Sequence, residues 1–425
     1  MRRREFLTKM FLGSSGLLLT PFDSLQERLQ AAGFSLPDLK IKRVRIHRLR
    51  QKLKEPMGYC CTPGAPLGMT SIGASVIEVE TDAGLTGWGD GQWGGDILRR
   101  HKDRVIGRSP FEVEAIFDEL TELGSVPFHS LPRNAPSPGG LDVALWDLVG
   151  KALGKPVSAL LGKQYRRRVM PYVSAGYRKD WQDLEAGFAG ELRHWTKDVG
   201  FRAAKVKTGY GPATDVRVVR AVREAVGEEI RLGIDSGTPG AYDDGTAVML
   251  GRQLEQFNLE FWEEPINKWD LEGYARLKKA LRIPLASGEA LPVDWLIENY
   301  IQKKTVDIAQ PDISTCGFTG GKRITYACWL NRVRLVPHSW GTPIRIASEM
   351  HWVACIPPLS RAWNPPPVLF ELHLPHESPA WGLTKERIEV DKTDGRIAVP
   401  AGPGIGVEID RDELERYRTS LVTIE

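Results

Sequence analysis

Two lysine residues with chemical potential, Lys205 and Lys207, lie two positions apart in the apolar run FRAAKVKTGYG at residues 201–211. In a β-strand, residues two apart point to the same side. If this run is a buried strand, both ammonium groups enter one interior, which is unfavourable unless negative charge lies nearby. The sequence therefore predicts carboxylates close to these lysines.

Three acidic residues lie at the ends of later apolar runs: Asp235 ends IRLGID, Glu263 lies in LEFWEE and Glu289 ends IPLASGE. Any one of them alone is explained as a helix N-cap or a solvated loop acid, but three at matching places favour a common site. Held together, they would raise one another's pKa, and a divalent cation would relieve the repulsion. All-oxygen ligation predicts Mg²⁺, with Mn²⁺ as the alternative ion. A nearby cation would also lower the pKa of a lysine toward the range of a general base.

Three further ionisable residues close the last apolar runs. Asp312 ends VDIAQPD and His338 ends VRLVPH, so a carboxylate–imidazole pair is predicted in which Asp312 sets the tautomer and raises the basicity of His338. The alternative for His338 is a buried histidine whose ring is hydrogen-bonded to the backbone, which explains a lone histidine equally well. Glu371 ends PPVLFE and is predicted to donate a proton or hydrogen bond to a developing oxyanion, with a salt-bridge role as the alternative.

The elements that must position these residues repeat along the second half of the chain. Eight short apolar runs recur, each separated from the next by room for one helix, and seven end on a charged or ionisable residue. They cover residues 168–174, 203–207, 230–235, 259–264, 283–289, 306–312, 333–338 and 366–371. Eight strands alternating with helices predict a closed parallel barrel with functional groups at the carboxyl ends of its strands. One helix is predicted after 203–207, capped by Thr214 or Asp215, with a valine stripe that ends at Gly227.

The first part of the chain has a different pattern. Strands are predicted at 41–50 and 75–81 and at the end of the glycine-rich segment 84–91, and helices at 111–123 and 140–153. At the N-terminus, Arg3 and Arg4 stand in the order R-R-x-F-L-x-K before a short apolar run. This pattern predicts a twin-arginine signal peptide and a periplasmic protein; an amphipathic tail is the alternative. The net charge of +3 gives no case for a nucleic-acid partner, and no segment predicts an integral membrane protein.

The ordered strand-end motifs KVK, GIDSG, WEEP, SGE, QPD and VPHSWGT resemble those of the enolase superfamily, in the mandelate racemase subgroup. Within it, the motifs look most like those of sugar-acid dehydratases and galactarolactone cycloisomerase. The resemblance implies an α/β fold, a TIM-like (β/α)7β barrel with an α+β capping domain built from the N-terminal region and the C-terminal tail. Two positions depart from the family pattern: Gly237 replaces a common asparagine, which puts a contact near the metal in doubt. Asp90 replaces a common glutamate, which puts substrate contacts of the capping domain in doubt.

The predicted domain boundaries follow from this resemblance. They are a signal peptide at 1–32, the capping domain at 38–160, the barrel at 161–372 and a C-terminal return to the cap at 373–425. The loops 55–69 and 91–96 are candidate lids, and Tyr59, Trp93 and Trp340 are candidate pocket residues. A homo-oligomer is expected.

The resemblance also implies the chemistry. Asp235, Glu263 and Glu289 would bind Mg²⁺, Lys207 or His338 would remove the proton α to a carboxylate, and Lys205 would help to stabilise the anion. The expected reaction is dehydration of a small-molecule sugar acid to a 2-keto-3-deoxy acid. Racemisation or epimerisation and lactone cycloisomerisation are the alternatives, and a non-catalytic sugar-acid binding protein is a remote one.

Overall fold

The structure is a computed structural model that describes residues 25–31, 33–58, 67–91, 95–124, 137–175, 177–237, 240–360, 362 and 365–425. Eight parallel strands form its central sheet in the order β10-β9-β8-β7-β6-β5-β4-β11. They are β4 Arg168–Ala175, β5 Ala203–Lys207, β6 Arg231–Asp235, β7 Leu259–Glu263, β8 Leu285–Ser287, β9 Ile308–Ala309, β10 Arg334–Leu335 and β11 Leu369–His373. Every predicted apolar run overlaps one of these strands, so the predicted barrel is confirmed.

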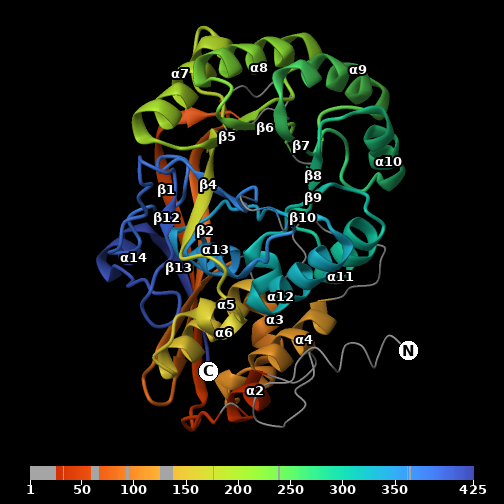
Figure 1. The fold of residues 1–425 in the computed structure, drawn as a ribbon. Coiled ribbons are helices and arrows are strands. Elements are labelled where there is room, and N and C mark those ends of the chain that lie inside the picture. Colours follow the sequence, from red (N-terminus) through yellow and green to blue (C-terminus); the bar gives the residue numbers. More distant parts are fainter. Residues whose placement is uncertain are drawn as a thin grey trace, which may run out of the picture.

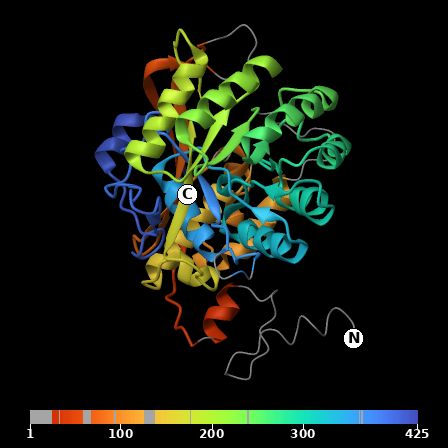
Figure 2. The same ribbon diagram turned by 45° about the horizontal axis from the view of Figure 1, so that its top comes forward.

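The sheet curls until its two outer strands approach each other. The backbone N–H of Glu371, in β11, donates a hydrogen bond to the carbonyl of Pro337, just after β10, at 3.2 Å. Figure 2 shows the connecting helices arranged around the outside of the strands. They are α7 Leu184–Arg193, α8 Pro212–Val226, α9 Asp244–Leu254, α10 Leu271–Ala280, α11 Val293–Trp295, α12 Ile313–Asn331 and α13 Pro343–Cys355. All strand ends that were predicted to carry chemistry therefore face one mouth.

Helix α8 shows how the sequence covers the barrel. Val219, Val222 and Val226 are fully buried, as the predicted stripe requires, and Gly227 follows the helix with φ +90°. The predicted cap is wrong: Gly211 is the N-cap and Pro212 begins the helix. Asp215 lies inside the first turn, where its carboxylate accepts hydrogen bonds from the N–H groups of the preceding loop at 2.8 and 3.0 Å.

The capping domain is a separate antiparallel sheet with helices packed against it, to the lower left in Figure 1. Its strand order is β13-β1-β2-β3, from β1 Ile41–Met57, β2 Met69–Thr81, β3 Thr86–Asp90 and β13 Arg418–Ile424. Its helices are α3 Gly95–Arg100, α4 Val113–Gly124, α5 Gly139–Ala152, α6 Val157–Leu161 and α14 Arg411–Tyr417. The short strand β12 Ile397–Ala398 pairs antiparallel with barrel strand β4. Because β13 comes from the chain's C-terminus and pairs with β1, the predicted return of the tail to the cap is confirmed.

Strand β3 lies unusually close to α5. An added Cβ at Gly89 would lie 1.9 Å from the carbonyl oxygen of Gly140, and one at Gly87 would lie 2.1 Å from that of Ala144. The glycines of the GWGD segment therefore let the strand and helix backbones touch. This contact places Asp90, at the end of β3, against the barrel.

The N-terminal residues that the signal-peptide prediction uses most, Arg3 and Arg4, lie outside the described residues. The described part of the predicted 1–32 segment is α2 Leu25–Ala31, whose Leu25 and Leu29 are buried. Arg28 forms an ion pair with Glu114 of α4 at 2.9 Å. Among the helices of the described residues, none is both long enough and apolar enough to cross a membrane.

Candidate active site

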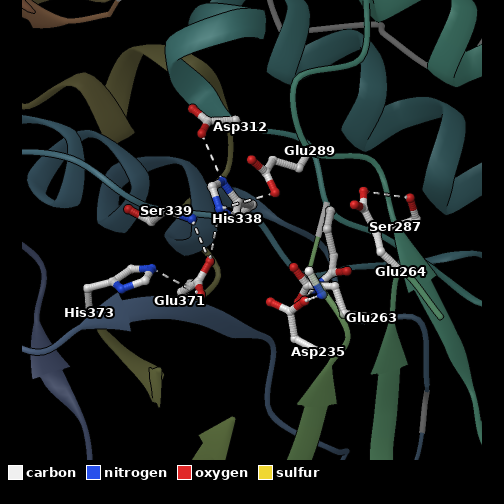
Figure 3. A network of polar contacts seen from close by, with 12 residues as sticks. Asp235, Glu263, Glu264, Ser287, Glu289, Asp312, His338, Ser339, Glu371 and His373 are labelled. Carbon is white, nitrogen blue, oxygen red and sulfur yellow. Dashed lines mark hydrogen bonds and ion pairs between the residues drawn. The ribbon is translucent and has the colours of Figure 1, made fainter. Parts of the chain in front are cut away.

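A cavity of about 370 Å³ lies at the carboxyl ends of the barrel strands, beneath the cap. Barrel residues and cap residues contribute to its wall, including Ser75, Tyr177, Lys207, Glu289, Asp312, His338, Trp340, Arg345 and His373. Figure 3 shows the polar side chains that meet there. The structure thus brings the predicted strand-end residues to one place.

Lys205 is the centre of the most buried part of this network. Its side chain is 1% exposed, and Nζ lies 2.9 Å from Glu263 Oε2, 2.7 Å from Glu371 Oε1 and 3.1 Å from Asp235 Oδ2. Burial alone lowers the pKa of Lys205, but these carboxylates outweigh it and hold the pKa well above its ordinary value. Lys205 is therefore a fixed positive charge rather than a base.

Lys207 points into the same interior, as its spacing from Lys205 predicted. Its Nζ forms a close ion pair with Asp235 Oδ2, and its residue lies beside Asp235 in the register of β5 and β6. The two ammonium groups hold the pKa of Asp235 below its ordinary value although burial acts in the opposite direction. Lys207 also lines the cavity, which places its amine where a substrate would bind.

Among the three acids, Glu263 has the raised pKa that mutual repulsion predicts. Burial and the neighbouring Asp235 raise the pKa of Glu263 to about 8, although Lys205 acts against the shift. The prediction was wrong for the other two acids. The pKa of Glu289 is lowered, because His338 and nearby lysines outweigh burial, and that of Asp235 is lowered as described above. The neighbouring lysines and His338 decide which carboxyl pKa is raised and which is lowered, whereas the sequence predicted only that the acids lie close together.

His338 lies between three carboxylates. Asp312 Oδ2 is 2.9 Å from its Nδ1, while Glu371 Oε2 and Glu289 Oε2 lie 3.6 and 3.7 Å from its Nε2. Burial alone lowers the pKa of His338, but Glu289, Glu371 and Asp312 together raise it to about 10. The predicted Asp312–His338 pair is present, and this pKa makes the imidazole of His338 cationic at neutral pH.

Glu371 has a different charge state from the one its predicted role needs. Its Oε2 accepts a hydrogen bond from the Ser339 N–H at 3.0 Å, and its Oε1 lies 3.3 Å from His373 Nε2. Burial raises its pKa, but Lys205, His338 and His373 outweigh burial and hold the pKa well below the ordinary value. An ionised carboxylate accepts hydrogen bonds and cannot donate one, so the predicted donor role is wrong for this set of neighbours.

The residues present fit a divalent cation. Asp235 and Glu263 are paired in the register of neighbouring strands, and Glu289 follows the next strand, β8. The first two already attract two ammonium groups, which shows that this end of the barrel favours positive charge. Three carboxylates from adjacent strands offer the oxygen ligands that Mg²⁺ or Mn²⁺ prefers, although their oxygens do not all lie within 4.8 Å of one another.

A second cluster of possible metal ligands lies outside this cavity. Among the described residues, Glu191, His376 and Glu377 are the one set of such groups whose ligand atoms all lie within 4.8 Å of one another. Lys179 Nζ already lies between the two glutamates, in a close ion pair with Glu191 and 3.3 Å from Glu377 Oε1. The three residues of the cluster do not line the strand-end cavity, and Lys179 pairs with both glutamates, so the cluster is explained as a buried ion-pair network.

Of the three candidate pocket residues, the described one is Trp340, which follows barrel strand β10. Trp340 lines the cavity, and its Nε1–H donates to the carbonyl of Glu377 at 3.2 Å. Tyr59 and Trp93, with most of their candidate lid loops, lie outside the described residues. Gly237, where the family pattern has asparagine, has φ +75°, and its N–H donates to Asp235 Oδ1 at 2.6 Å.

Sequence reasoning missed three residues of the site. Gln310 Nε2 donates to Glu263 Oε2 at 2.9 Å, His373 faces Glu371, and Arg345 pairs with Asp312. For His373, a signal was available, because it lies two residues after Glu371 and so on the same side of a strand. Arg345 lies on a helix, and the strand-end pattern had no means of indicating it.

Comparisons with known proteins agree with this geometry. Residues 65–162 match the mandelate racemase/muconate lactonizing enzyme N-terminal domain, and residues 187–413 match the enolase C-terminal domain-like family. D-galactarolactone cycloisomerase of Agrobacterium fabrum is 32% identical over 389 residues, which cover 89% of this chain and 99% of the relative.

Two solved structures resemble the whole fold. The 3,6-anhydro-D-galactonate cycloisomerase from Zobellia galactanivorans has a TM-score of 0.73 at 30% identity, over 90% of this chain and 100% of that one. L-talarate dehydratase from Polaromonas sp. JS666, complexed with Mg and L-glucarate, has a TM-score of 0.72 at 27% identity, over 91% of this chain and 99% of that one. The chain therefore belongs to the enolase superfamily, in the mandelate racemase subgroup, and is an enzyme of the lyase or isomerase type found there.

Proposed function

We propose that this enzyme removes the proton α to a carboxylate with the help of Mg²⁺ or Mn²⁺, and that it dehydrates a sugar acid to a 2-keto-3-deoxy acid. One observation carries the proposal: Lys207 and His338 reach the same cavity from far-apart strands. Their strands, β5 and β10, are separated by β4 and β11 on one side and by β6 to β9 on the other. A substrate between them has one proton-transfer group on each side.

The metal proposal rests on Asp235, Glu263 and Glu289, which would hold the cation. Bound there, it supplies positive charge beside the substrate carboxylate and so increases the acidity of the α-hydrogen. The Mg named in the complex of the Polaromonas relative supports the choice of ion. Lys205 adds a second, permanent positive charge next to the same carboxylates.

The two proton transfers can be assigned from charge state. Lys207 must leave its ion pair with Asp235 and lose its proton before its amine can take the α-proton. His338 is already protonated, because Glu289, Glu371 and Asp312 raise its pKa. The C–H electron pair then forms the C=C bond while the C–O bond to the β-hydroxyl breaks. His338 gives its proton to that oxygen, water leaves, and the enol product converts to the 2-keto acid.

Lactone cycloisomerisation is the second candidate, because the names of two relatives, from Agrobacterium and Zobellia, describe cycloisomerases. It uses the same α-carbon chemistry but needs a ring oxygen as the leaving or attacking group. Racemisation or epimerisation would return the proton from the opposite side. The candidates differ in the substrate consumed and in whether 2-keto acid is released.

The test is a screen of sugar acids and their lactones with Mg²⁺, with detection of 2-keto product. In D₂O, NMR follows exchange of the α-proton at the same time. We expect His338→Asn to lose dehydration yet keep exchange through Lys207, and Lys207→Ala to lose both. An enzyme that turns over only lactones, or that scrambles the α-centre without releasing 2-keto acid, would overturn the dehydratase proposal in favour of an isomerase.

We also propose that the protein is exported to the periplasm by the twin-arginine route. The support is the arginine pair Arg3 and Arg4, followed by a short apolar run. That route carries folded proteins, which suits a metal-dependent enzyme loaded before export.

A further inference from the structure

Arg345 connects the capping domain to the catalytic pair. It lies in α13, and its guanidinium donates from one nitrogen to Asp90 Oδ1 at 2.8 Å. Another nitrogen donates to Asp312 Oδ2 at 3.1 Å and to Asp312 Oδ1 at 3.3 Å. Asp90 belongs to cap strand β3, whereas Asp312 follows barrel strand β9. One buried guanidinium therefore joins carboxylates of both domains.

Asp90 is itself held by the barrel. Its Oδ2 accepts hydrogen bonds from both the backbone N–H and the Oγ1–H of Thr342, each at 2.7 Å. Thr342 is the N-cap residue of α13, so Asp90 of the cap supplies the acceptor at the start of that helix. Both carboxylate oxygens of Asp90 are thus used, and the side chain that departed from the family pattern has a role at the domain contact.

Gly341 leaves room for the contact between Asp90 and Arg345. A Cβ added to Gly341 would lie 2.4 Å from Arg345 Nε and 2.8 Å from Asp90 Oδ2. Any other residue at this position would force the guanidinium or the carboxylate to move. The glycine of the VPHSWGT motif therefore admits the Asp90–Arg345 pair.

The other contacts of Asp312 explain what the guanidinium controls. Asp312 Oδ1 accepts hydrogen bonds from the backbone N–H of Ser314 at 2.7 Å and from its hydroxyl at 2.5 Å. Asp312 Oδ2 faces His338 Nδ1 at 2.9 Å. Ser314 alone leaves the carboxylate free to turn about one oxygen. Arg345 Nη1, within 3.3 Å of both oxygens, adds a second charged contact that restricts this rotation and thereby the direction of the bond to His338.

We propose that Arg345 and Asp90 are positioning residues for the Asp312–His338 pair, so that the seated capping domain sets the orientation of the catalytic imidazole. The inference rests on the proposed function for the role of His338 as the acid. Contacts of this kind change activity by about 10- to 100-fold when they are removed. The effect should fall on the step that uses His338 and spare the step that uses Lys207.

The test compares Arg345→Met, Arg345→Lys and Asp90→Asn with the parent enzyme. We expect Arg345→Met to lower kcat for dehydration by about 10- to 100-fold with KM within about 3-fold, while α-proton exchange through Lys207 persists. Arg345→Lys keeps the charge but not the planar fork, so an intermediate loss is expected. The double variant Asp90→Asn/Arg345→Met should lose no more than Arg345→Met alone, because both changes act through one contact.

Arg223→Lys is the matched control. Arg223 is also a buried arginine, 5% exposed. It donates to backbone carbonyls that precede β6 and β7, at the amino ends of the barrel strands, including those of Ile230 and Phe257. This variant should lower stability and leave the ratio of dehydration to exchange unchanged. An equal change of that ratio in Arg223→Lys and Arg345→Met would overturn the inference.

A readout without turnover separates the two hypotheses. The Nδ1 proton of His338, assigned by its loss in His338→Asn, should give a low-field NMR signal that shifts or broadens in Arg345→Met. If parent enzyme forms no 2-keto acid but the signal moves as expected, the proposed dehydration fails and the positioning inference stands. If parent enzyme dehydrates a sugar acid while Arg345→Met leaves both the signal and the ratio unchanged, the positioning inference fails.

Discussion

Replacing Lys205 by methionine removes one positive charge from the most buried ion-pair network of the barrel. The ammonium contacts Asp235, Glu263 and Glu371 at distances of 2.7 to 3.1 Å, and all four side chains are at most 3% exposed. Methionine has a similar length and leaves little cavity, so the loss of charge dominates. We expect Lys205→Met to be much less stable without divalent metal.

The expected loss of unfolding free energy is set by the least costly way in which the folded protein can remove the unpaired negative charge. One carboxyl group left without its cation can take up a proton from solvent. At pH 7 that uptake costs about 3.8 kcal/mol for a glutamate whose unfolded pKa is about 4.3, at about 1.4 kcal/mol per pH unit. A carboxyl whose pKa is higher in the folded state binds a proton on folding, so stability rises as pH falls. The deficit should therefore shrink to about 1.7 kcal/mol near pH 5.5.

Urea unfolding in EDTA, followed by tryptophan fluorescence, measures this deficit at both pH values. The control is Lys197→Met, which removes an exposed ion pair with Glu229 and should cost less than about 1 kcal/mol. Mg²⁺ at about 100 times its Kd should restore up to about 2.7 kcal/mol to a variant that still binds it. A deficit in Lys205→Met that equals the control, or that does not shrink in acid, would refute this reasoning.

Three other predictions concern pH, metal and export. His351 is neutral because burial lowers its pKa to about 4, while its ring accepts from the Ser158 N–H and contacts the Ile405 carbonyl. Because the pKa of His351 is lower in the folded state than in the unfolded state, stability is lost as pH falls from about 6.5 to 4, by up to about 3 kcal/mol. Urea unfolding of His351→Gln should show a smaller loss over the same pH range. Glu263→Gln should weaken Mg²⁺ binding by at least about 100-fold in calorimetry with a small change in Tm, and full turnover in excess EDTA would contradict a metal role. Changing Arg3 and Arg4 to lysine should leave precursor in the cytoplasm on fractionation, and unchanged export would count against the twin-arginine route.

The local pattern of the chain determined the barrel and the place of its chemistry. Apolar runs of strand length, each followed by room for a helix, permit few folds, because parallel strands need crossover connections and bury both faces. The two-residue period of a strand placed Lys205 and Lys207 on one side, and the carboxyl end of each run placed Asp235, Glu263 and Glu289 at one mouth. These inferences need only covalent geometry and side-chain type, so the sequence alone was sufficient for them.

The charge states of the same residues were decided by the tertiary structure. Whether a carboxyl is a proton donor or an anion depends on distances of a few Å to groups far away in the chain. Lys205 and His338 hold Glu371 ionised, and Asp235 raises the pKa of Glu263 to about 8. Electrostatic energy changes steeply over such distances in a buried site, and residue spacing along the chain does not report them.

The contact of Arg345 with Asp90 and Asp312 shows the same limit most clearly. These residues are separated by 255 and 33 positions, and the contact forms only when β3 of the cap packs against α13 of the barrel. No local period predicts it, because surfaces from two domains must meet to form it. The sequence thus determined which candidate groups lie at which end of the barrel, and the tertiary structure decided how they are held and charged.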